Sequence, residues 1–136
     1  MLRLLARPHP FLGIVLGLFV LAVTGCDSSE TDTPDIAGSW SGAASLPAGF
    51  TVSMNLDQRG RSISGTADLP NRRNTIIVGE INDSDRFVWD VQVGCERWSG
   101  SLAIDEAAEE MSGSINLDGG GCAPATSASG TMTLSR

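Results

Sequence analysis

Apolar and polar residues alternate along the chain from Ile36 onward, a period that is typical of β-strands with one buried face. In the stretch 50–56, for example, every second residue is apolar and the residues between them are polar. This alternation predicts eight strands, at 38–46, 50–58, 61–69, 74–82, 86–94, 96–104, 110–118 and 127–135. The connections between them are short and rich in turn-forming residues, which indicates an antiparallel meander.

Six of the predicted strands carry a glycine in phase with their apolar residues. These glycines are Gly42, Gly65, Gly79, Gly100, Gly113 and Gly130. Glycine weakens a flat strand, but in a tightly coiled sheet it lets the backbone bend and makes room for large neighbours such as Trp40 and Trp98. Eight strands can close into a barrel without exposed edges. The last predicted strand ends almost at Arg136, as expected if it pairs with the first strand. The predicted fold class is therefore all-β, an eight-stranded antiparallel up-and-down β-barrel with a polar, soluble exterior.

The first 25 residues have the pattern of a signal peptide. Arg3 and Arg7 precede an apolar run at 11–23, which is shorter than the roughly 20 residues that a membrane-spanning helix needs. The run ends in Val23-Thr24-Gly25-Cys26, which resembles the lipobox of bacterial lipoproteins. The resemblance implies cleavage before Cys26 and lipidation of its thiol and amine, whereas the alternative is an ordinary signal peptide with an incidental cysteine.

Three segments follow from this pattern: a lipoprotein signal peptide at 1–25, a lipidated cysteine with a disordered acidic tether at 26–35, and a β-barrel domain at 36–136. The acyl chains would hold the protein on the extracytoplasmic side of the cell envelope, with the membrane as its partner. Asp27 resembles an inner-membrane retention signal in some bacteria only, so the choice between inner and outer membrane stays open.

The charge and the residue types exclude several classes of function. All 16 acidic residues follow Gly25, together with seven of the nine basic ones, so this part carries a net charge of −9. This charge repels the phosphates of nucleic acid, and we expect no nucleic acid partner. The only histidine, His9, precedes Gly25, and the chain has no lysine or tyrosine. Catalytic units and zinc or copper sites that need histidine are therefore excluded from the exported part. We expect no enzymatic activity, no catalytic residue, no metal and no cofactor.

Cys95 and Cys122 remain as a pair once Cys26 is lipidated. In an exported protein an even number of cysteines suggests a disulfide, and two free thiols are the alternative.

The motif Gly38-Ser39-Trp40 is similar to the Gly-x-Trp sequence that opens calycin barrels, the group of lipocalins and avidins. Ser64-Gly65-Thr66 and Trp98-Ser99-Gly100 follow in the order of avidin-type barrels. The resemblance implies barrel topology, an ability to hold a small molecule, and a place for Trp98 at the pocket. The tyrosine of the biotin site corresponds to Ala67, and other polar ligands of biotin are also missing, so we expect no biotin binding.

Five aromatic residues follow Gly25, and they could either line an apolar pocket or fill the barrel core: Trp40, Phe50, Phe87, Trp89 and Trp98. The first alternative predicts a non-catalytic binding module for a small apolar ligand or a secreted partner protein, including an enzyme that it inhibits. The second predicts a structural envelope lipoprotein whose barrel is a filled spacer. Arg72-Arg73 and the acidic stretch 105–110 are expected to be solvated turns rather than ion sites.

Overall fold

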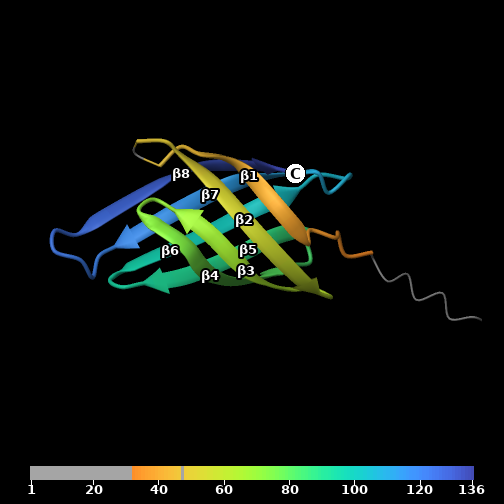
Figure 1. Ribbon diagram of the computed structural model, residues 1–136, viewed down its shortest axis with the longest axis horizontal. Coiled ribbons are helices and arrows are strands. Elements are labelled where there is room, and N and C mark those ends of the chain that lie inside the picture. Colours follow the sequence, from red (N-terminus) through yellow and green to blue (C-terminus); the bar gives the residue numbers. More distant parts are fainter. Residues whose placement is uncertain (1–31, 47) are drawn as a thin grey trace, which may run out of the picture.

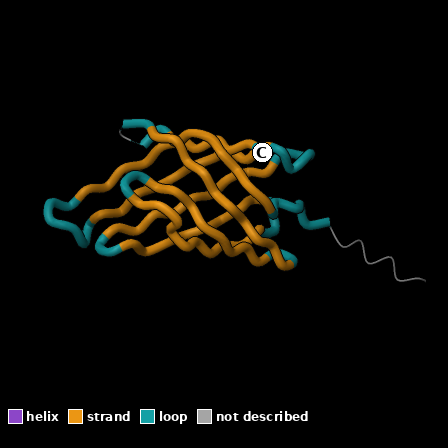
Figure 2. The backbone as a smooth tube through the Cα atoms, viewed as in Figure 1, coloured by secondary structure: helices purple, strands orange, loops and turns teal. Residues whose placement is uncertain are grey.

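The computed structural model describes residues 32–46 and 48–136, so the predicted signal peptide and Cys26 lie outside the described residues. The described residues form one closed antiparallel barrel of eight strands (Figures 1 and 2). The strands are β1 (Gly38–Ala44), β2 (Phe50–Arg59), β3 (Ser62–Leu69), β4 (Arg72–Ile81), β5 (Arg86–Val93), β6 (Glu96–Ile104), β7 (Glu110–Gly119) and β8 (Thr126–Ser135). Each strand pairs with the next one in the chain, and β8 pairs with β1, which confirms the predicted fold class. This part of the chain contains no helix long and apolar enough to cross a membrane.

The strand bounds agree with the predicted ones to within two residues, and β4 shows why they differ. Leu69 pairs with Arg72, so only Pro70 and Asn71 form the connection between β3 and β4. Asn71 adopts a left-handed conformation with φ of 59°, which asparagine tolerates in tight turns. Arg72 and Arg73, which the sequence placed in a loop, therefore open β4.

The glycines of the inner face allow two kinds of close approach. A Cβ atom on Gly42 would overlap the carbonyl oxygen of Thr133 on β8, where the barrel closes. A Cβ atom on Gly100 would overlap the indole ring of Trp89 on the neighbouring strand. Glycine at these positions thus permits both the strong coiling of the sheet and the packing of a large side chain against the wall.

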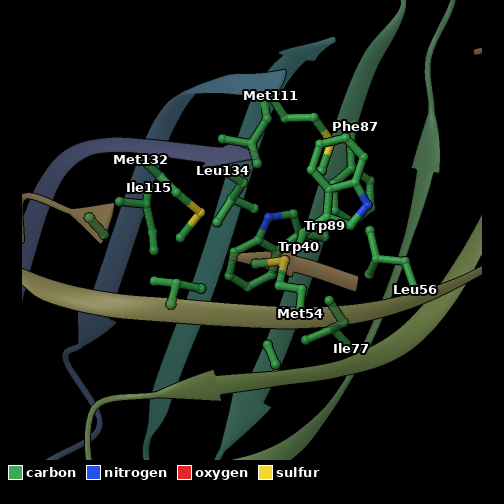
Figure 3. Close-up of a cluster of buried hydrophobic side chains, with 14 of the residues drawn as sticks. Trp40, Met54, Leu56, Ile77, Phe87, Trp89, Met111, Ile115, Met132 and Leu134 are labelled. Carbon is green, nitrogen blue, oxygen red and sulfur yellow. The ribbon is translucent and has the colours of Figure 1, made fainter. Parts of the chain in front are cut away.

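The barrel interior is packed with apolar side chains, and the described residues include no buried polar or charged residue in the core. Trp40, Phe87 and Trp89 are at most 1% exposed and lie at its centre. They pack among aliphatic and methionine side chains from many strands, including Met54 and Met111 (Figure 3). The middle of the barrel is therefore filled and leaves the ends as the places where a small molecule can bind.

One end of the barrel is closed by the irregular segment that precedes β1. Ile36 is fully buried, and its backbone N–H donates a hydrogen bond of 2.8 Å to the side-chain oxygen of Gln58. Its carbonyl oxygen accepts a hydrogen bond of 2.8 Å from the indole nitrogen of Trp40. Because both backbone groups of Ile36 have partners, the residue can be buried without an unsatisfied polar atom.

The same end is also tied to the C-terminus. The guanidinium group of Arg136 lies 4.8 Å from the centre of the Trp40 ring and donates to the carbonyl oxygen of Asp35. Gln58 adds a hydrogen bond of 2.9 Å to the carbonyl oxygen of Pro34. The last residues of the predicted tether are thus attached to the barrel, and the chain enters the fold at this closed end (Figure 1).

Candidate functional site

The opposite end of the barrel carries the candidate site. It is formed by the described residues of four connections, 45–46 with 48–49, 70–71, 94–95 and 120–125, which lie together at the left of Figure 1. A pocket of about 350 Å³ opens among them, and we call it the mouth pocket. Its lining residues are Leu46, Ala48, Gly49, Phe50, Pro70, Asn71, Glu96, Trp98 and Leu117. This volume is within the range of small-molecule sites.

The walls of the mouth pocket are mainly apolar. Trp98 is 3% exposed, and Phe50 meets it edge to face, with ring centroids 6.0 Å apart and an interplanar angle of 85°. Leu117 lies beside Trp98 because the two residues are register partners on β7 and β6. Side chains from β2, β6 and β7 thus form one apolar surface at the point where the packed core ends.

A single carboxylate interrupts this apolar lining. Glu96 opens β6, and its carboxylate accepts a hydrogen bond of 3.3 Å from the indole nitrogen of Trp98. The bond holds the carboxylate against the aromatic ring and fixes the orientation of the indole. Glu96 and Asn71 are the side chains that can offer polar contacts to a molecule in the pocket.

A disulfide between Cys95 and Cys122 braces the open end and confirms the predicted pair. It joins the turn before β6 to the connection between β7 and β8, with Cα atoms 5.2 Å apart. Cys95 directly precedes Glu96, so the cross-link also restrains the start of the strand that carries Glu96 and Trp98.

The five aromatic residues proposed from the sequence separate into two groups. Phe50 and Trp98 line the mouth pocket, whereas Trp40, Phe87 and Trp89 lie in the filled core and are not among its lining residues. The alternation of the strands shows that all five point inward, but it carries no information on depth along the barrel. Pattern reasoning also missed Leu46, Pro70, Glu96 and Leu117, because their role depends on which end of the barrel is open.

Other polar clusters have local structural roles. The carboxylate of Asp105 accepts hydrogen bonds from the backbone N–H groups of Glu109 and Glu110, which lower its pKa and close the acidic turn. The backbone N–H of Asn74 and the hydroxyl of Ser53 likewise lower the pKa of Asp68. No group of three or more potential metal ligands occurs within residues 32–46 and 48–136.

Comparisons with protein-family models, with curated proteins and with solved structures found no match to this chain.

Proposed function

We propose that the protein is a lipid-anchored, non-catalytic binding module of the cell envelope that holds a small apolar molecule in its mouth pocket. The observation that carries this proposal is the contrast between the two ends of the barrel. One end is sealed by Ile36, while the other leaves a pocket lined by Phe50, Trp98 and Leu117 above a packed core. A barrel that served only as a spacer would gain stability by filling this volume.

The barrel topology and the motif Gly38-Ser39-Trp40 support a calycin-like fold, in which small molecules bind at an open end. The missing biotin ligands argue against biotin itself. The lack of histidine and lysine after Gly25 supports a role in binding without catalysis.

The proposed anchor and the mouth pocket are at opposite ends. The chain enters the barrel at the closed end, where Pro34 and Asp35 are held by Gln58 and Arg136. An anchor at Cys26 would therefore keep the sealed end toward the bilayer and direct the pocket toward the medium. Replacing Cys26→Ala should release the protein into the soluble fraction, and a variant that stayed bound to the membrane would contradict the anchor.

Native mass spectrometry of the protein after mild extraction tests the binding function. We expect an additional mass that corresponds to a co-purifying molecule. Leu117→Trp, which places an indole in the mouth pocket beside Trp98, should remove this mass. Thr133→Trp, which adds the same side chain at an exposed position of β8, is the matched control and should retain it. A wild-type protein that shows no additional mass and takes up no added apolar molecule would instead favour a structural role, with the barrel as a spacer.

A partner protein is a second candidate, because the outer face of the barrel carries exposed apolar side chains. Ile76 and Val78 of β4 are 73% and 59% exposed, and Val88 of the adjacent strand is 36% exposed. Side chains of this kind on a sheet surface are typical of protein contacts. Cross-linking from position 80, an exposed residue of the same strand, to an envelope protein would support this alternative if it were lost on Ile76→Ser and Val78→Ser.

A further inference from the structure

We infer that the mouth pocket selects an apolar molecule that carries an organic cation, such as an alkylamine or a quaternary ammonium group. The inference rests on the proposed function, since it specifies the ligand class of that pocket. Among the described residues that line the pocket, Glu96 carries the one charged side chain, and it is an acid. The apolar surface would contact the hydrocarbon part of the ligand, and the carboxylate would pair with its cationic group.

The contacts of Glu96 leave it available to a ligand. Its hydrogen bond from Trp98 uses one carboxylate oxygen, and within the described residues it forms no ion pair. Glu96 is half-buried, so part of its surface is withdrawn from water. An incoming cation can form a charge-assisted hydrogen bond in place of the lost contacts with water. Phe50 lines the same pocket, and the face of an aromatic ring attracts positive charge.

A metal ion fits these residues less well than an organic cation. Calcium and magnesium need several oxygen ligands, whereas the pocket lining offers one carboxylate and the amide of Asn71. An organic cation needs only one negative group, and its carbon atoms can use the apolar walls. The overall acidity of the exported chain also attracts cationic molecules rather than anionic ones.

Arg72 is a competing charge beside the turn that precedes Glu96. Its guanidinium group would be 3.8 Å from a Cβ atom on Gly94, in the turn that precedes Glu96. It lines an outer groove together with Asp68 and Arg73, and it is not among the residues of the mouth pocket. If Arg72 determined selectivity, the pocket would prefer anionic amphiphiles, so the two possibilities predict opposite results.

A titration with three probes of equal chain length tests the inference: octyltrimethylammonium, 1-octanol and octyl sulfate, each below its micelle-forming concentration. The exported chain with Cys26→Ala is used, because acyl chains would compete for the probes. The three tryptophans give three indole N–H signals in a nitrogen–proton correlation spectrum. The Trp98 signal should move on binding, while the Trp40 signal, hydrogen-bonded at the closed end, should stay in place.

We expect the ammonium probe to bind about tenfold more tightly than 1-octanol, and octyl sulfate to bind more weakly than both. Glu96→Gln keeps an oxygen that can accept the Trp98 hydrogen bond but removes the charge. It should lower the affinity for the ammonium probe about tenfold and change the affinity for 1-octanol much less, because only the ammonium probe uses the charge. Glu106→Gln, an equal change of net charge at the opposite end of the barrel, should alter none of the three affinities.

Equal affinities for all three probes would overturn the inference but leave the binding function intact. Tightest binding of octyl sulfate would also overturn it and would assign selectivity to Arg72. If no probe moved the Trp98 signal, both the inference and the proposed function would be wrong.

Discussion

The indole nitrogen of Trp40 donates a hydrogen bond of 2.8 Å to the carbonyl oxygen of Ile36, four residues earlier in the chain. This contact connects the centre of the core to the segment that closes one end of the barrel. Ile36 in turn donates its backbone N–H to Gln58. One end is thus sealed by an apolar residue whose backbone groups are satisfied by two side chains, and the other end is left open.

Gln58 is predicted to be essential for this closure. Gln58→Ala removes the partners of the Ile36 N–H and of the Pro34 carbonyl, so the free energy of unfolding in urea should fall by about 1 to 3 kcal/mol. Gln92→Ala is the control, because exposed Gln92 bonds only locally, to the carbonyl of Gly94, and its loss should change stability by less than about 0.5 kcal/mol. Equal effects of the two variants would contradict the role of Gln58.

Gly100 should tolerate no larger side chain while Trp89 is present. Gly100→Ala forces the added methyl group against the indole of Trp89 and should destabilise the barrel by about 1 to 3 kcal/mol in denaturant unfolding. Trp89→Phe combined with Gly100→Ala should lose less stability than the two single changes added together, because the smaller ring relieves the overlap. Gly120→Ala, in the connection after β7, should have little effect; additive losses in the double variant would argue against the contact.

The disulfide should contribute substantially to stability. Cys95 and Cys122 are 27 residues apart, and on the chain-entropy estimate a cross-link of that length stabilises the fold by about 3.5 kcal/mol. Cys95→Ser combined with Cys122→Ser should lower the urea midpoint accordingly, and reductant should lower the wild-type midpoint but leave the variant unchanged. Identical midpoints with and without reductant would rule out a stabilising cross-link.

Asp105 should make stability depend on pH in the acidic range. Hydrogen bonds from the backbone N–H groups of Glu110 and Glu109 lower its pKa below the ordinary value of 3.8 in the folded state. The stability that these bonds provide is therefore fully present above that value and is lost as the pH falls through the lowered pKa. Asp105→Asn should flatten the acid limb of a plot of urea midpoint against pH. Asp57→Asn on the outer face of β2 serves as the control, and an unchanged limb in Asp105→Asn would refute the assignment.

The architecture could be predicted from the sequence because it depends on a local signal that recurs in every strand. Alternation fixes which side chains point inward, and short connections between neighbouring strands leave few topologies other than a meander. The sequence pattern also predicted that Gly42 and Gly100 face inward, and the structure shows the close contacts that require glycine there. The partner of Gly100 could not be predicted, because it is Trp89 from the next strand rather than a neighbour in the chain.

The site was only partly predictable. Phe50 and Trp98 were among the candidates for a pocket, but the alternation that identified them equally identified core residues such as Phe87. Which residues line an open pocket depends on which end of the barrel is closed. The sequence indicated the closed end only by a single apolar residue, Ile36, that follows a polar segment. Glu96 was missed because an acid at the start of a strand has the pattern of an ordinary exposed residue.

The location of a bound apolar molecule tests most directly whether the open end of the barrel is a binding site. We would crystallise the chain from residue 27 onward with 1-bromooctane and locate bromine by its anomalous scattering. We expect a bromine peak within the mouth pocket, between Phe50, Trp98 and Leu117. Bromine found only on the outer face beside Ile76 and Val78, or no ordered bromine at all, would contradict a binding function at the open end of the barrel.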